Sequence, residues 1–171
     1  MLHVAQGGPV ITFRAPHPAD GHWVHTLVSG CAPLDLNSTY AYLLLCTHFA
    51  GTCAVAERGD ALVGFVSGYR QPDEPTTLFI WQVAVGASVR GQGVGTRLLR
   101  KVLGRPALSN VRHLETTINP SNEASWGLFR SLARALEADC HEHTLFGQEA
   151  FGPDGHEEER LLRIGPMNKE S

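Results

Sequence analysis

The sequence has no long apolar run and no run of basic residues. Its longest apolar stretches fall far short of the roughly 20 residues that a membrane-spanning helix needs. The first ten residues, MLHVAQGGPV, lack the basic region and long apolar run of a signal peptide. Lysines and arginines number 14 against 17 aspartates and glutamates, which gives a formal net charge of −3. We therefore expect a cytoplasmic protein whose partner is neither a membrane nor a nucleic acid.

Cysteine pairs with the spacing of zinc or redox motifs are also missing. The four cysteines, Cys31, Cys46, Cys53 and Cys140, are irregularly spaced, and none belongs to a C-x-x-C pair. In a cytoplasmic chain this spacing favours buried thiols over disulfides and supplies no zinc ligand set. The His-Glu-His segment at 141–143 would place two imidazoles on one strand face, but no third ligand is close in sequence. We expect a polar strand face there and no metal.

The length of 171 residues and the 43% apolar content predict one domain over 1–171, with a core from about 9 to 166 and flexible termini. Three consecutive strands before a β-α-β unit predict a mixed sheet flanked by helices, in the α/β class. The expected order is β-α-α-β-β-β-α-β-α-β-β. Strands are expected at 10–14, 53–57, 61–70, 77–85, 111–118, 141–146 and 159–164, and helices at 20–29, 39–49, 94–103 and 122–136.

Two segments carry further expectations. The centre of the helix 39–49, Tyr42 to Cys46, is apolar on all sides, which predicts that this helix is largely buried. The segment 147–155 is rich in turn residues and is expected to form a loop on the substrate side.

The loop Arg90-Gly91-Gln92-Gly93-Val94-Gly95 lies between an expected strand and an expected helix. Glycines let the backbone approach a ligand closely, and the free N–H groups of the first helical turn favour an anion. A phosphate or pyrophosphate is therefore the expected ligand. A Walker A loop is excluded because Thr96-Arg97 follows Gly95, and a Rossmann loop is excluded because its third glycine would fall on Thr96 or Leu98.

What remains is Arg-x-x-Gly-x-Gly behind a strand that ends in Val83-Ala84-Val85. This resembles the acetyl-CoA signature of the GNAT superfamily of N-acetyltransferases, as does the order of elements; the motif alone would also fit a turn that merely caps a helix. The resemblance implies the GNAT fold, acetyl-CoA as co-substrate and contact of Asn122 with the pantetheine. The expected donor-binding residues are Val83, Val85, Arg90, Gly91, Gln92, Gly93, Val94, Gly95, Thr96 and Asn122.

Phe129 departs from that pattern, because many GNAT proteins carry at this position a tyrosine that protonates the leaving thiolate. In this chain the thiolate must leave unprotonated or take its proton from another group or from water. The missing tyrosine also keeps open a non-catalytic acyl-CoA sensor.

Three longer segments, 33–49, 79–85 and 156–164, resemble the L-2,4-diaminobutyrate acetyltransferases of ectoine biosynthesis. The resemblance implies acetyl transfer to the 4-amino group of L-2,4-diaminobutyrate, a role in osmotic stress, and a homodimer; the strand region 140–142 is a possible edge for it. A GNAT enzyme for another amine, such as a polyamine, an aminoglycoside or a protein amine, is the alternative.

The acceptor is a small zwitterion with a second cationic amine, so its pocket needs carboxylates and an anion partner. Asp35 precedes the helix 39–49, Tyr40 lies in its first turn, and Trp81 lies on the strand that leads to the glycine loop. Together they would supply a carboxylate, a hydroxyl and an apolar wall. An exposed turn is the alternative for Asp35, and simple core packing is the alternative for the two aromatic residues.

The acceptor amine has a pKa of about 10.4, so only on the order of one part in a thousand is neutral at pH 7, equivalent to a barrier of roughly 4 kcal/mol. A positioned base offsets that barrier. The run Glu157-Glu158-Glu159 offers one, although three acids at a strand start also fit a solvated surface. Strand alternation separates Glu158 from Glu157 and Glu159. We favour Glu158 as the catalytic carboxylate, with Glu159 second, together with Asp35 and Tyr40.

Direct attack in a ternary complex is the expected mechanism. Backbone N–H groups near Val83 to Val85 would polarise the thioester carbonyl. Cys31, Cys46 and Cys53 have no obvious histidine partner in the sequence, which argues against a covalent intermediate.

Overall fold

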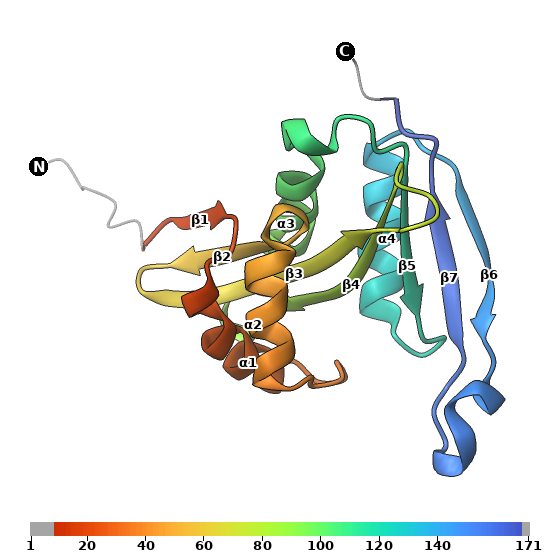
Figure 1. Ribbon diagram of the computed structural model, residues 1–171, viewed down its shortest axis with the longest axis horizontal. Coiled ribbons are helices and arrows are strands. Elements are labelled where there is room, and N and C mark those ends of the chain that lie inside the picture. The colour runs from red at the N-terminus through yellow and green to blue at the C-terminus, as the bar shows by residue number, and fades with distance from the viewer. Residues whose placement is uncertain (1–8, 169–171) are drawn as a thin grey trace, which may run out of the picture.

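A computed structural model describes residues 9–168 of the chain, so the expectation of flexible termini lies outside the described residues. The expected order of elements and the α/β class are confirmed, and the largest boundary shift is the start of the fifth strand, at His113 (Figure 1). The elements are β1 (Ile11–Arg14), α1 (Gly21–Ser29), α2 (Thr39–His48), β2 (Ala54–Arg58), β3 (Ala61–Arg70), β4 (Thr77–Val85), α3 (Val94–Leu103), β5 (His113–Ile118), α4 (Glu123–Ala135), β6 (Cys140–Phe146) and β7 (Glu159–Ile164).

The seven strands form one mixed sheet in the order β1-β2-β3-β4-β5-β7-β6, in which only the β4–β5 pair is parallel. These two strands pair only from Thr77 to Ile80 on β4, and the Thr116 hydroxyl donates to the Ile80 carbonyl at 2.9 Å where the pairing ends. Beyond that point β4 and β5 diverge (Figure 1). The second half of β4 therefore has backbone groups on one side that no neighbouring strand occupies.

A β-bulge at Trp81 changes the alternation of β4. Ser67 of β3 is opposite Gln82, and the next residue, Gly68, is opposite Ile80, so Trp81 is the extra residue. Ile80 and Val83 consequently contact the same core cluster although they lie three positions apart. The bulge leaves the Trp81 side chain half-exposed at 46%.

Two core clusters cover the two faces of the sheet. One contains residues of α3 and α4, such as Leu98 and Leu132, and the other contains residues of α1 and α2, such as Val24 and Tyr42. Neighbouring strand residues divide between them, because Ala54 packs with the first cluster and Val55 with the second.

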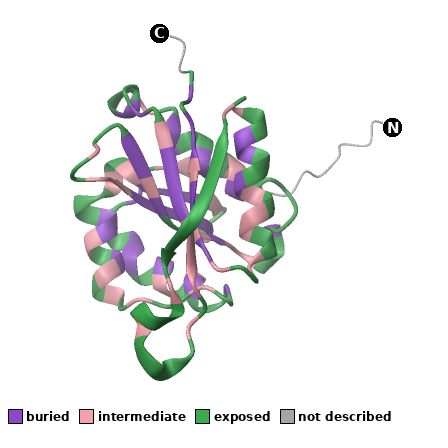
Figure 2. Cartoon of the chain, turned by 90° about the vertical axis from the view of Figure 1, so that its right-hand side faces the viewer, coloured by how far each residue is buried: buried purple, intermediate pink, exposed green. Residues whose placement is uncertain are grey.

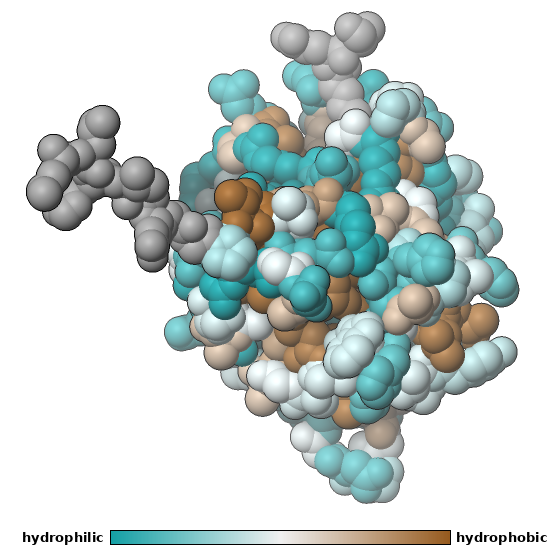
Figure 3. All heavy atoms as spheres, turned by 90° about the vertical axis from the view of Figure 1, so that its left-hand side faces the viewer, coloured by the Kyte–Doolittle hydropathy of each residue, from teal (hydrophilic) through white to brown (hydrophobic). Residues whose placement is uncertain are grey.

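The expectation that α2 is largely buried is wrong. Tyr42, Leu45 and Cys46 are buried, but Tyr40 is 68% and Leu43 38% exposed. One side of the helix packs against α1 and shares a core cluster with Val55 and Phe65 of the sheet, so an all-round apolar sequence leaves its other side in solvent. On the face of the molecule that carries β1 and β2, apolar atoms lie in patches between polar ones (Figure 3).

The segment 147–155 is not a plain loop. It forms short 3-10 turns over Gln148–Asp154, interrupted at Gly152, whose φ is 75°. The strand before it, β6, is exposed along its whole length and is the outermost strand of the sheet (Figure 2). No helix within residues 9–168 is long and apolar enough to cross a membrane.

The four cysteines are free thiols. Three are buried as expected, whereas Cys140, on β6, is exposed. Residues 9–168 contain no group of three or more histidine, cysteine, aspartate and glutamate side chains that could hold a metal ion.

Candidate active site

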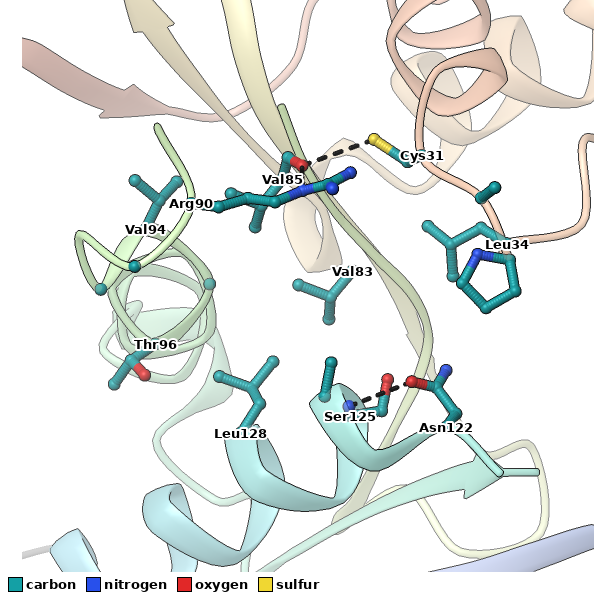
Figure 4. A pocket seen from close by; sticks show the side chains of 16 residues that line it. Cys31, Leu34, Val83, Val85, Arg90, Val94, Thr96, Asn122, Ser125 and Leu128 are labelled. Atoms are coloured by element: carbon teal, nitrogen blue, oxygen red, sulfur yellow. Dashed lines mark hydrogen bonds between the residues drawn. The ribbon is translucent and has the colours of Figure 1, made fainter. Parts of the chain in front are cut away.

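A groove of about 410 Å³ lies between the end of β4 and the first turns of α3 and α4 (Figure 4). Leu34, from the segment after α1, faces it from the far side, and Val83 points into its centre (Figure 4). Gln92 is exposed and does not line the groove. Its side-chain amide lies outside it, 3.5 Å from the Ser88 carbonyl oxygen. The other nine expected donor-binding residues do line it: Val83, Val85, Arg90, Gly91, Gly93, Val94, Gly95, Thr96 and Asn122.

The glycine loop is built for an anion. Gly91 and Gly93 have left-handed φ values of 76° and 73°, which side-chain-bearing residues rarely adopt. Gly93 is the N-cap of α3 and offers no capping side chain, so the N–H groups of the first turn are free of a side-chain cap. A Cβ atom at either glycine would meet no protein atom within 4 Å. Within the protein, glycine is therefore needed there for its backbone conformation and not to avoid a clash.

The end of β4 contributes backbone groups to the same groove. The N–H groups of Gln82 and Gly86 donate to Ser67 Oγ and to the Val63 carbonyl, both on β3. Because the direction of the N–H groups alternates along a strand, those of Val83 and Val85 point to the side from which β5 has diverged. The Val85 carbonyl accepts from Cys31 Sγ on that side, at 3.5 Å (Figure 4).

A second, smaller cavity of about 120 Å³ adjoins the groove. The two spaces share Val83, Asn122 and Ser125, together with Pro33 and Leu34, so they meet between β4 and the start of α4. Asn122 is held there as the N-cap of α4, since its Oδ1 accepts the Ser125 N–H at 3.2 Å. The lining includes Asp35, Trp81 and Glu159 but neither lysine nor arginine among the described residues. Two carboxylates without a cation favour a positively charged ligand.

Glu159, not Glu158, faces this cavity. The Glu159 side chain is 18% exposed, and its Oε1 accepts from Asn119 Nδ2 at 2.9 Å. Glu158 points away, toward β6, where Thr144 Oγ1 donates to it at 3.0 Å and Arg160 lies 3.5 Å away. Strand alternation separates the two residues as expected, but the preference for Glu158 is not supported by its position. Their placement depends on the pairing of β7 with β5 and β6, which the acidic run does not encode.

Asp35 lies at the mouth of the cavity, with its side chain 88% exposed. Its backbone is held by two buried side chains, Gln82 and Tyr42, that the sequence analysis did not predict for the site. Gln82 Nε2 donates to the Asp35 carbonyl at 2.6 Å, and the Tyr42 hydroxyl donates to Gln82 Oε1 at 3.1 Å. The Asn37 N–H donates to the same hydroxyl at 3.3 Å. The sequence indicated this role only through a glutamine within the apolar strand 77–85, because a buried amide requires hydrogen-bond partners.

Two aromatic residues, Tyr40 and Phe129, differ in their relation to the cavity, and Tyr40 does not take the substrate-binding position expected of it. Tyr40 lies on the exposed side of α2 and does not line the cavity. Phe129 is buried and does line it, so an aromatic ring without a hydroxyl closes the side toward α4.

Burial makes two of the cysteines poor nucleophiles. It raises the pKa of the Cys46 thiol to about 12 and that of the Cys53 thiol to about 11, so both stay protonated at neutral pH.

A groove with a glycine loop at a helix N-terminus, opening onto an acidic cavity, fits an enzyme that carries an acyl group from a phosphorylated carrier to an amine. Residues 24–133 match the model of the Acetyltransferase (GNAT) family, and the chain belongs to this family.

Within it, the chain belongs to the L-2,4-diaminobutyric acid acetyltransferases. It is 51% identical to the enzyme of that name from Halomonas elongata over 156 residues, 90% of this chain and 80% of the other. It is 48% identical to that of Methylotuvimicrobium alcaliphilum over 159 residues, 93% and 92% of the two chains.

Solved structures also match this chain. The diaminobutyrate acetyltransferase EctA from Paenibacillus lautus, in complex with its substrate L-2,4-diaminobutyric acid and coenzyme A, superposes with a TM-score of 0.90 at 40% identity, covering 96% of this chain and 99% of the other. A GNAT-family protein of Desulfovibrio desulfuricans, at 15% identity, superposes with a TM-score of 0.69 over 91% and 99% of the two chains and shows the shared fold alone.

Proposed function

We propose that this protein transfers the acetyl group of acetyl-CoA to the 4-amino group of L-2,4-diaminobutyrate, giving N4-acetyl-L-2,4-diaminobutyrate in ectoine biosynthesis. The observation that carries the proposal is the acidic cavity beside Val83, which opens into a groove shaped for a phosphorylated carrier. The similarity over nearly the whole chain to enzymes named for this substrate supports it.

Acetyl-CoA is the donor in this proposal. Its pyrophosphate binds at the first turn of α3, and its pantetheine arm follows β4 past Asn122. The thioester carbonyl then accepts a hydrogen bond from the Val83 N–H. A donor placed to hold the oxyanion of the tetrahedral intermediate contributes about 3 kcal/mol to catalysis.

The acceptor binds in the smaller cavity. Its ammonium group lies between Asp35 and Glu159, and the Trp81 ring forms a wall. The carboxylate of the acceptor needs hydrogen-bond donors, which the lining offers in Trp81, Thr117 and Asn122. Tyr40 and Glu158 have no contact with the substrate in this arrangement.

The neutral amine attacks the thioester carbon directly, the carbon–sulfur bond breaks, and coenzyme A leaves. Phe129 offers no proton for the sulfur. Asn122 and Ser125 are the polar side chains that line both spaces in the described part of the chain, so they are placed beside the leaving thiolate.

We further propose that the protein works as a cytoplasmic homodimer under osmotic stress. The outermost strand, β6, supports an interface, because it is exposed along its length and its Phe146 side chain is 50% exposed. Light scattering coupled to size-exclusion chromatography tests the dimer, and a monomer at micromolar concentration would contradict it.

The activity is tested with purified protein, acetyl-CoA and a panel of amines, read by thiol release and by the mass of the product. Diaminobutyrate should be the preferred acceptor, acetylated on its 4-amino group. Preference for putrescine or lysine would contradict the proposal. Lack of turnover with every amine would favour the acyl-CoA sensor that Phe129 keeps open.

A further inference from the structure

His156 lies beside the acceptor cavity, close to the two carboxylates of its lining, Asp35 and Glu159. Its Nε2 atom is 3.9 Å from Asp35 Oδ2 and 4.0 Å from Glu159 Oε1. The imidazole stacks on Phe151, with ring centroids 3.9 Å apart and an interplanar angle of 17°. The turns over Gln148–Asp154 thus supply the surface that holds this ring in place.

The other ring nitrogen fixes which form of the imidazole is present. His156 Nδ1 lies 2.5 Å from the Glu157 carbonyl oxygen, which can only accept a hydrogen bond. Nδ1 therefore carries the proton in the neutral ring, and Nε2 presents a lone pair. Nε2 is the ring nitrogen near Asp35 and Glu159, the two carboxylates that hold the acceptor's ammonium group in the proposed function.

We propose that His156 is the base that removes a proton from the 4-ammonium group of the acceptor, an inference that rests on the proposed function. Asp35 and Glu159 hold the ammonium group by charge, and the imidazole takes its proton. An imidazole is a stronger base than a carboxylate and is the side chain most often used as a general base. The side chain is 31% exposed, so it can return the proton to solvent after each turnover.

The ammonium group gives one proton to His156 Nε2, and the freed lone pair forms the bond to the acetyl carbon. The carbon–sulfur bond then breaks, with its electron pair on sulfur, and the remaining excess proton on nitrogen goes to the thiolate. The products are the acetamide, coenzyme A as the thiol, and imidazolium.

The groups that face His156 favour this transfer. Asp35 comes from the segment before α2 and Glu159 from β7, and Phe151 covers one face of the ring. The Glu157 carboxylate is turned away, since it accepts from Ser121 Oγ at 2.5 Å. The imidazolium formed in the reaction therefore faces two negative charges.

The test is His156→Gln, compared with wild type from pH 7 to pH 10 with saturating acetyl-CoA. At pH 7 we expect kcat to fall by about 10²- to 10⁴-fold, the usual contribution of a general base, with the KM for diaminobutyrate little changed. Between pH 7 and 9 the variant's rate should rise about tenfold per pH unit, because the free amine grows in that proportion below its pKa of about 10.4.

A second variant, His156→Ala, is assayed with added imidazole, which should restore part of the rate. His22→Gln is the matched control, because His22 is exposed on α1, outside the site, and this variant should behave as wild type. Calorimetry with acetyl-CoA checks that each variant retains its donor site.

Three results would overturn the proposal: an unchanged kcat, a rise in KM alone, or a loss of rate that neither high pH nor imidazole relieves. The first leaves His156 without a role, the second makes it a binding residue, and the third a structural one. Wild-type turnover with diaminobutyrate tests the proposed function in a separate sample, so the two failures are distinguishable.

Discussion

The donor groove and the acceptor cavity share a wall but are built in different ways. The donor groove takes half of its lining from one continuous stretch, 83–96, and the rest from residues 31–34 and from α4 with its N-cap. The acceptor cavity takes its lining from β4, β5, α4, β7 and the segment before α2. In the proposed function, backbone amides would recognise a phosphate common to many donors, whereas side chains from five places would recognise one particular acceptor.

The two sites are also stabilised differently. In the donor groove the left-handed glycines set the direction of the N–H groups, so conformation alone makes the site. In the acceptor cavity the exposed Asp35 is placed by a buried hydrogen-bond chain through Gln82 and Tyr42. Substitutions should therefore affect one site at a time, and each of the following experiments tests that separation.

The largest effect on substrate binding is expected from Glu159→Gln. The substitution removes the partly buried carboxylate that binds the acceptor's ammonium group in the proposed function. The KM for diaminobutyrate should rise about 100-fold, which corresponds to the loss of a hydrogen bond to a charged group, about 1.5–3 kcal/mol. The Kd for acetyl-CoA should stay within twofold. Glu158→Gln is the matched control, because its carboxylate faces Thr144 and Arg160 instead. Equal KM values for the two variants would remove the distinction between these neighbours.

Gly93→Val should act on the donor side alone. A β-branched residue at a φ of 73° costs about 1–3 kcal/mol, and its side chain occupies the space left for the phosphates. We expect acetyl-CoA binding to weaken at least tenfold by calorimetry. Gly127→Ala, in α4, is the control, since a Cβ there meets nothing within 4 Å and φ is ordinary. Normal acetyl-CoA binding by the valine variant would refute the loop assignment.

Asp35→Ala should raise the KM for diaminobutyrate, because it removes a carboxylate that binds the ammonium group in the proposed function. The rise should be only about tenfold, because this carboxylate is exposed and screened by solvent. Gln82→Leu should raise this KM by a similar factor, because it releases the Asp35 backbone. The substitution should also lower the free energy of unfolding by about 1–3 kcal/mol.

The double variant carries the sharper test. If Gln82 acts by placing Asp35, the KM effects of the two substitutions should not add. Fully additive effects would mean that Gln82 contacts the acceptor by itself.

The smallest effect is expected from blocking thiols. Iodoacetamide at pH 8 should modify Cys140, which is exposed, and spare Cys46 and Cys53, whose pKa values burial raises to about 12 and about 11. Activity should be unchanged, because neither site uses a thiolate. Mass spectrometry of the intact protein measures the modification, and loss of activity in step with it would challenge direct attack.

Much of the fold was predictable because periodicity and turn residues are local signals. The boundaries of β3, β4, α3 and β7 agree with the sequence prediction. The burial of α2 was not predictable, since apolar residues on all sides of a helix do not say how many sides a sheet will cover. The bulge at Trp81 was not predictable either, because it arises from the pairing of β4 with β3.

The part of the donor groove's lining that lies at 83–96 was predictable from local sequence, apart from Gln92, which lies outside the groove. A strand, a glycine loop and a helix in succession contain everything that a phosphate-binding turn needs, since its ligands are the backbone groups of that segment. Tertiary structure decided the acceptor side. Only the packing of β7 turned Glu159 inward and Glu158 outward, and it also brought His156 to Asp35, 121 positions earlier in the chain. Such contacts depend on strand register and side-chain direction, which no local run of residues encodes.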